Sequence, residues 1–180
     1  MKKLLVVIDY QNDFVNGALG FDGAEDLEPG IYAAAQQTLA EDGYVLFTRD
    51  THPAEYLKTR EGKHLPVPHC IEGTEGHALF GRLHAFEETP HPHTMLLDKF
   101  TFGSPDIGQR ATELCSGAPD IVDVCGVVTD ICVLSNTLAL HASLPGSQIR
   151  VLGPLCGSGN KEAAQKAIDL LQGMGIEVTN

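Results

Sequence analysis

Asp9, Lys99 and Cys132 are far apart in the chain, but each lies just beyond a short apolar segment that is typical of a buried β-strand. The carboxyl ends of parallel strands meet at one edge of an open α/β sheet, where catalytic groups gather. A thiol, a carboxylate and an ammonium brought together there can attack a carbonyl carbon. The thiol would be the nucleophile, the carboxylate its acid and base, and the ammonium the counter-charge. The spacing therefore predicts a cysteine-dependent catalytic site.

Each of the three residues, taken singly, also fits a structural role. Cys132 could be a small apolar side chain packed on a helix, and Asp9 could cap a turn. Lys99 could point to solvent at the end of its strand. The catalytic interpretation is favoured because all three residues occur at strand ends.

Cys132 is expected in the first turn of a helix that follows the apolar run Ile121–Val128. Thr129 and Asp130 offer side-chain oxygens that can cap such a helix. The helix dipole and the free N–H groups of the first turn would stabilise a thiolate and lower the pKa of the Cys132 thiol. The same N–H groups could hold the oxyanion of a tetrahedral intermediate.

Apolar runs alternate with amphipathic segments along the chain, which is the pattern of a parallel sheet covered by helices on both faces. We expect strands at Leu4–Ile8, Tyr44–Thr48, Thr94–Leu97, Ile121–Val128, Gln148–Leu152 and Glu177–Thr179. We expect helices at Glu28–Glu41, Pro105–Leu114, Asp130–His141 and Asn160–Met174, with a further short helix near Gly76–His84. The fold class is therefore α/β, a single three-layer α/β/α domain over residues 1–180 with a mostly parallel sheet.

The composition narrows the classes of function. An apolar content of 43% in 180 residues is typical of a globular domain, and a net charge of −12 argues against a nucleic-acid partner. The apolar run Leu4–Ile8 is too short for a signal peptide or a membrane span, so we expect no membrane partner and a cytoplasmic location. The five cysteines are odd in number and form no C-x-x-C pair, which argues against a disulfide framework.

Five motifs carry a resemblance that spans most of the chain. They are V-V-I-D-Y-Q-N-D-F at Val6–Phe14, T-R-D-T-H-P at Thr48–Pro53, P-H-C-I-E-G-T-E-G at Pro68–Gly76, D-K-F-T-F-G-S at Asp98–Ser104 and G-V-V-T-D-I-C-V at Gly126–Val133. Together they resemble the isochorismatase-like cysteine hydrolase superfamily, in particular its nicotinamidase and pyrazinamidase branch. The motifs are specific to the superfamily and less specific to one substrate. The resemblance implies the isochorismatase-like hydrolase fold.

The resemblance assigns roles to individual residues. It makes Asp9, Lys99 and Cys132 the catalytic triad. It implies a cis peptide bond between Val127 and Val128, which would aim the Val128 N–H into an oxyanion hole beside that of Cys132. We expect Phe14 and Val127 to contribute to the substrate pocket.

The resemblance to the nicotinamidase branch also implies a divalent metal held by Asp50, His52 and His69. One carboxylate and two imidazoles suit Zn²⁺, Fe²⁺ or Mn²⁺ and leave coordination positions for water or substrate. On the residues alone, polar side chains that cap turns remain the alternative. No organic cofactor is expected, because Gly157-Ser158-Gly159 lacks the third glycine of a dinucleotide-binding loop.

The activity that the resemblance implies is hydrolysis of a small carboxamide through a thioester, with nicotinamide converted to nicotinate and ammonia as the leading reaction. Members often form dimers or tetramers, so a homo-oligomer is expected. One departure affects the substrate: many nicotinamidases carry an aromatic residue where this chain has Leu65-Pro66-Val67-Pro68, and the chain contains no tryptophan.

Alternative functions remain open at this point. Within the superfamily, they are a C–N hydrolase acting on a ureido or N-carbamoyl compound and an isochorismatase-type ether hydrolase. Outside it, a phospho-acceptor signalling module also uses Asp and Lys at strand ends, but it expects adjacent acids after the first strand and gives Cys132 no role. A non-catalytic homologue is disfavoured by the intact triad.

Overall fold

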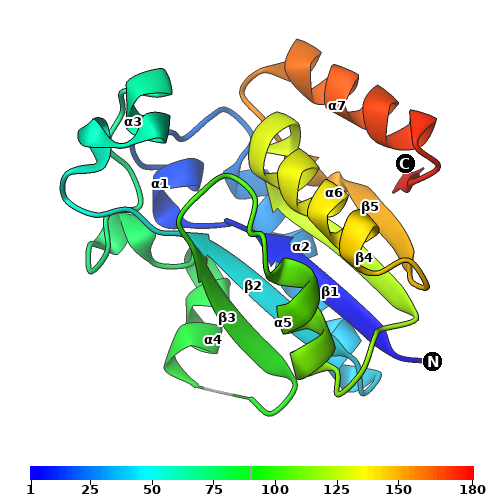
Figure 1. Cartoon of the computed structure of the whole chain (residues 1–180). Helices are drawn as coiled ribbons and strands as arrows, with labels where there is room; N and C mark the ends of the chain where they lie inside the picture. Colours follow the sequence, from blue (N-terminus) through cyan, green and yellow to red (C-terminus); the bar gives the residue numbers. More distant parts are fainter. Residues whose placement is uncertain (90) are drawn as a thin grey trace.

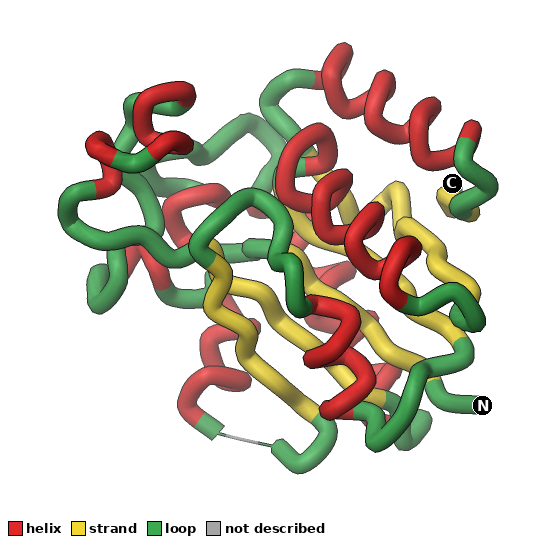
Figure 2. The backbone as a smooth tube through the Cα atoms, in the orientation of Figure 1, coloured by secondary structure: helices red, strands yellow, loops and turns green. Residues whose placement is uncertain are grey.

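The computed structural model describes residues 1–89 and 91–180, and its centre is a six-stranded sheet in the order β3-β2-β1-β4-β5-β6 (Figures 1 and 2). All neighbouring strands are parallel. The strands are β1 Lys3–Ile8, β2 Tyr44–Asp50, β3 Thr94–Lys99, β4 Ile121–Val127, β5 Gln148–Gly157 and β6 Glu177–Thr179. The expected α/β class and the mostly parallel sheet are confirmed.

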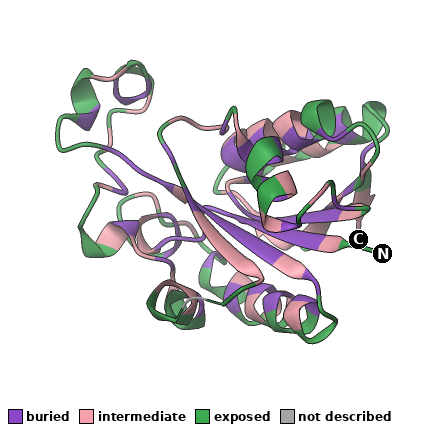
Figure 3. Ribbon diagram, turned by 60° about the horizontal axis from the view of Figure 1, so that its bottom comes forward, coloured by how far each residue is buried: buried purple, intermediate pink, exposed green. Residues whose placement is uncertain are grey.

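Helices connect the strands and cover both faces of the sheet, so that the buried residues lie between the layers (Figures 1 and 3). The α-helices are α1 Asn12–Val15, α2 Glu28–Ala40, α3 Arg60–His64, α4 Ala85–Glu88, α5 Ile107–Leu114, α6 Leu134–Ser143 and α7 Lys161–Gly173. None of the helices in the described part of the chain is long and apolar enough to cross a membrane.

The alternation of side chains along β1 divides the core in two. Leu4, Val6 and Ile8 pack on the side of α5, α6 and α7. Leu5 and Val7 pack on the opposite side with α2. Because both faces of β1 are buried, the strand is continuously apolar, as a central parallel strand must be.

Two differences from the expected elements lie beside the candidate site. β5 continues past Leu152 through Pro154 to Gly157, because an irregular register accommodates extra residues: Val124 pairs with Val151 while Gly126 pairs with Cys156. The helix after β4 begins with a π-helical turn, Thr129–Val133, in which the Val133 N–H donates to the Val128 carbonyl at 3.1 Å. Single π-turns of this kind are frequent at functional sites.

The long segment between β2 and β3 is built from short helical turns and loops. Its expected short helix near Gly76–His84 is two separate 3₁₀ turns, Glu75–His77 and Gly81–His84, the second of which runs into α4. This segment carries His69 to the carboxyl edge of the sheet. The helix start expected at Asn160 is confirmed, because its side chain accepts a hydrogen bond from the Ala163 N–H at 3.0 Å.

Candidate active site

Asp9 and Lys99 form a buried ion pair at the carboxyl ends of β1 and β3. Lys99 Nζ lies 2.7 Å from Asp9 Oδ2, and both side chains are inaccessible to solvent or nearly so. Thr48, on the intervening strand β2, donates its hydroxyl to Asp9 Oδ1 at 2.6 Å. The three neighbouring strands thus fix the carboxylate in one orientation.

Cys132 completes the group that the strand ends predicted. It lies in the π-helical turn after β4 and is only 2% exposed. Its Sγ atom is 3.9 Å from Lys99 Nζ, and the neighbouring Asp9 carboxylate acts to raise the pKa of the thiol. The structure therefore brings Asp9, Lys99 and Cys132 together, with Lys99 Nζ close to both the carboxylate and the sulfur.

The electrostatics of this group differ from the expected thiolate. Burial raises the pKa of Cys132 well above its ordinary value of 9.0, and the pull of Lys99 in the other direction does not compensate for it. The helix start at Cys132 is covered by protein, so the dipole acts on a desolvated sulfur. The resting group is a neutral thiol, and attack by sulfur requires a base in contact with it.

The pKa values of the two carboxylates around Lys99, Asp9 and Asp50, are shifted in opposite directions. Burial and the nearby Asp50 raise the pKa of Asp9 above 3.8, although Lys99 opposes them. For Asp50, burial also acts to raise the pKa, but Lys99 and hydrogen bonds from His52 and His69 outweigh it and lower the value. The environment thus favours the ionised form at Asp50 more strongly than at Asp9.

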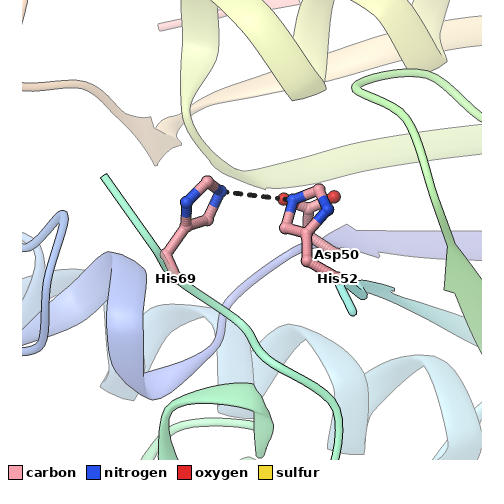
Figure 4. A group of neighbouring side chains, drawn as sticks. All are labelled: Asp50, His52 and His69. Atoms are coloured by element: carbon pink, nitrogen blue, oxygen red, sulfur yellow. Dashed lines mark hydrogen bonds and ion pairs between the residues drawn. The ribbon is translucent and has the colours of Figure 1, made fainter. Parts of the chain in front are cut away.

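Asp50 also gathers the residues expected to bind a metal. Its Oδ2 atom lies 2.9 Å from His52 Nε2 and 3.2 Å from His69 Nε2 (Figure 4). All three side chains are buried, and their ligand atoms lie within 4.8 Å of one another. The predicted set is therefore one compact group, in contact with the Asp9–Lys99 pair through Asp50.

The hydrogen bonding of His69 fits a cation in this group. Its Nδ1 lies 2.7 Å from the Val67 carbonyl, which can only accept, so Nδ1 carries a proton. In a neutral ring, Nε2 would then direct a lone pair at the Asp50 carboxylate. A proton on Nε2 or a metal ion removes this repulsion, and a backbone carbonyl behind a ligating imidazole is the usual outer partner of a metal site.

A pocket of about 500 Å³ opens beside Cys132. Its lining is mainly apolar, with aromatic, aliphatic and small side chains around a few polar ones. The lining residues are Phe14, Ala18, Leu19, Gly20, Phe21, Leu65, His69, Phe102, Val128, Asp130, Ile131, Cys132, Ser158, Gly159 and Asn160. A size and lining of this kind suit a small, largely apolar ligand with one polar group directed at Cys132.

Of the two residues expected in the substrate pocket, Phe14 and Val127, only Phe14 lines it. Phe14 lines the pocket, and its ring meets His69 edge to face at a centroid distance of 5.3 Å. Val127 is fully buried in the core and is not among the lining residues. The peptide bond from Val127 to Val128 is cis, and Val128 borders the pocket together with Cys132.

Several residues of the site were not predicted from the sequence. Phe21 and Phe102 supply aromatic walls in addition to Phe14. Glu61 is buried and accepts a hydrogen bond from the Phe102 N–H at 2.9 Å, which ties α3 to the loop after β3. The sequence offered a clue to Phe102, because this residue belongs to the D-K-F-T-F-G-S motif and lies three positions after Lys99. Phe21 had none, because the irregular segment that carries it shows no periodicity.

Comparisons with known proteins agree on one family for this chain. The family model described as the isochorismatase domain matches residues 3–180. A Bacillus subtilis (strain 168) protein named uncharacterized isochorismatase family protein PncA is 32% identical over 170 residues, which cover 90% of each chain. A nicotinamidase of Schizosaccharomyces pombe (strain 972 / ATCC 24843) is 29% identical over 170 residues, covering 77% of this chain and 75% of its own.

Solved structures have the same fold. The crystal structure of the nicotinamidase PncA from Bacillus subtilis matches with a TM-score of 0.86 at 30% identity, over 100% of both chains. The pyrazinamidase of Pyrococcus horikoshii, solved in complex with zinc, matches with a TM-score of 0.84 at 20% identity, over 100% of this chain and 99% of its own. With the family model extending over nearly its whole length, this chain belongs to the isochorismatase family of hydrolases.

Proposed function

We propose that this protein is a cysteine amidohydrolase that converts nicotinamide to nicotinate and ammonia. The observation that carries the proposal is the grouping of Cys132 and Asp9 around Lys99 beside a pocket with aromatic walls. Relatives named nicotinamidase support the substrate. Aromatic side chains such as Phe14 and Phe102 suit a flat ring, and they take the place of the aromatic residue absent at Leu65–Pro68.

The first half of the reaction forms a thioester. Cys132 Sγ attacks the amide carbon while its proton passes to Asp9, the carboxylate that Lys99 holds beside it. The N–H groups of Val128 and Cys132 stabilise the oxyanion. Asp9 then gives the proton to the amide nitrogen as the C–N bond breaks, and ammonia leaves.

The second half releases the acid. A water molecule attacks the thioester carbon, its proton passes to Asp9, and the C–S bond breaks as the sulfur regains that proton. Lys99, at 2.7 Å from Asp9, favours the carboxylate form that each proton acceptance requires. The catalytic groups are thus returned to their starting protonation states.

The metal group belongs to the same proposal. Asp50, His52 and His69 would hold a divalent cation, with Zn²⁺, Fe²⁺ and Mn²⁺ as the ions that suit these ligands. When bound, the cation supplies a Lewis-acidic position for the ring nitrogen or a water molecule. His69 both belongs to this group and lines the pocket, which puts a ligand of the cation beside the substrate.

Two further parts of the proposal concern the setting of the enzyme. The described structure contains five free cysteines, four of them buried, which suits a reducing compartment such as the cytoplasm. A homo-oligomer is proposed from the resemblance to family members. Gel filtration with light scattering measures the oligomeric state, and a monomer at micromolar concentration would contradict that part.

The test is ammonia release from a panel of amides, measured before and after treatment with a chelator. Nicotinamide and pyrazinamide are expected to release ammonia, and an N-carbamoyl amino acid is not. Chelation is expected to remove the activity, and added Zn²⁺ or Mn²⁺ to restore it. Ammonia from the N-carbamoyl compound alone would contradict the proposed substrate.

A further inference from the structure

The pocket beside Cys132 contains one acidic side chain that the proposed reaction does not use. Asp130 lines the pocket two residues before the nucleophile. Among the described lining residues there is no lysine or arginine, and Lys99 is buried next to Asp9 and Asp50 rather than in the lining. Among the described residues, the pocket that receives the substrate therefore has a carboxylate in its wall and no lysine or arginine opposite it, so that positive charge in the lining is confined to His69 and a cation that it would help to hold.

The geometry of Asp130 leaves half of its carboxylate available. Ser158, at the end of β5, donates its hydroxyl to Asp130 Oδ1 at 2.5 Å, and the same hydroxyl accepts from the Asn160 N–H at 3.1 Å. Oδ2 has no hydrogen-bond or ion-pair partner in residues 1–89 and 91–180. Both Asp130 and Ser158 line the pocket and are partly exposed. One oxygen is held in place, and the other is left for a ligand.

We propose that Asp130 sets the charge selectivity of the pocket, so that the enzyme accepts neutral or cationic amides and rejects amides that carry a carboxylate. This inference rests on the proposed amidase function and specifies its substrate class. A fixed carboxylate in a partly desolvated pocket repels an anion and accepts a hydrogen bond from an N–H group. The same repulsion acts on the product, because hydrolysis turns a neutral amide into a carboxylate in the same pocket.

The wild-type enzyme gives the first test, with two substrates that differ by one charge. Benzamide and 3-carbamoylbenzoate have the same reacting amide, and only the second carries a carboxylate on the ring. The value of kcat/KM is expected to be lower for 3-carbamoylbenzoate by about tenfold, as for one like-charge contact at several ångströms. Equal values would overturn the inference while leaving the amidase function intact. Failure to release ammonia from nicotinamide would contradict the function itself.

Variants give the second test, with nicotinate binding measured by calorimetry so that no turnover is needed. Asp130→Asn removes the charge and is expected to tighten nicotinate binding about fivefold. Ser158→Ala is the matched control, because it removes the hydrogen bond to Asp130 Oδ1 but keeps the charge of the carboxylate. Its nicotinate binding is expected to stay as weak as in the wild type. Tightening in both variants, or in neither, would overturn the assignment to the Asp130 charge.

Discussion

Asp50 and Lys99 form a buried ion pair of 2.9 Å that joins the group of Asp9, Lys99 and Cys132 to the group of Asp50, His52 and His69. Lys99 holds Asp9 on one side and Asp50 on the other, while the second oxygen of Asp50 faces His52 and His69. A change of charge at Asp50 therefore acts on Cys132, because both side chains are buried and the interaction is weakly screened. The two groups act as one electrostatic unit.

This ion pair predicts that substitutions at Asp50 and at His52 have different effects on the reactivity of Cys132. Both Asp50→Asn and His52→Ala should weaken zinc binding by more than the about 10- to 100-fold typical of outer-shell partners. Only Asp50→Asn removes a negative charge that raises the pKa of Cys132. In chelator-treated protein at pH 7, Asp50→Asn should therefore react with iodoacetamide several-fold faster than the wild type, and His52→Ala should not. Equal alkylation rates in the two variants would contradict the electrostatic link.

The close packing around Gly126 predicts that even substitution by alanine causes a large loss of stability. It pairs with Ile8 across β1 and β4 and has a φ of 115°. A Cβ atom at this position would lie 2.1 Å from the Ile8 carbonyl oxygen. Gly126→Ala should lower the free energy of unfolding by about 3 kcal/mol or more, since both strain and overlap act on backbone that cannot move away.

The control for this prediction is Gly146→Ala. No atom lies within 4 Å of a Cβ built at Gly146. The substitution should change the free energy of unfolding by less than about 1 kcal/mol. Urea unfolding of both variants measures the difference, and similar midpoints for the two would show that the close approach at Gly126 is unimportant.

The pairing of Glu28 with Arg82 predicts a dependence of stability on pH. Two guanidinium N–H groups donate to the Glu28 carboxylate at 2.9 and 2.7 Å, and these hydrogen bonds lower the pKa of Glu28 below 4.5. Because the folded state binds this proton less tightly than the unfolded state, the stabilisation is complete above pH 4.5 and disappears as the pH falls through the lowered value. Glu28→Gln should therefore be less stable than the wild type at pH 7.

The measurement for Glu28 is the difference in urea midpoint between Glu28→Gln and the wild type across this pH range. The difference should shrink toward zero as the pH falls below 4.5, because the wild-type carboxylate becomes neutral like the amide. A difference that stays constant from pH 7 to pH 3 would mean that the effect of the substitution is steric.

Much of the site could be predicted because strand ends converge. Asp9 follows β1, Lys99 is the last residue of β3, and the turn that carries Cys132 follows β4. Parallel strands bring these carboxyl ends to one edge. The pairing of Thr48 with Asp9, by contrast, depends on which strands are neighbours, and no local pattern gives strand order. The link from Asp50 to Lys99 is hidden for the same reason.

Other features depend on tertiary packing, which no local sequence pattern reveals. The pKa of Cys132 was expected to fall because its position at a helix start is visible in the sequence, whereas its burial is not. The register irregularity that lets β5 run through Pro154 is likewise set by its pairing with β4. Phe21 reaches the pocket from a loop without periodicity.

The most direct test of the account is the kcat for ammonia release from nicotinamide by Cys132→Ala. The variant should lose at least about 1,000-fold in kcat, since no other thiol among the described residues borders the pocket to form the thioester. Cys115→Ala, which removes a buried thiol outside the pocket, should keep the wild-type rate. Wild-type ammonia release by Cys132→Ala would contradict the claim that this sulfur is the nucleophile.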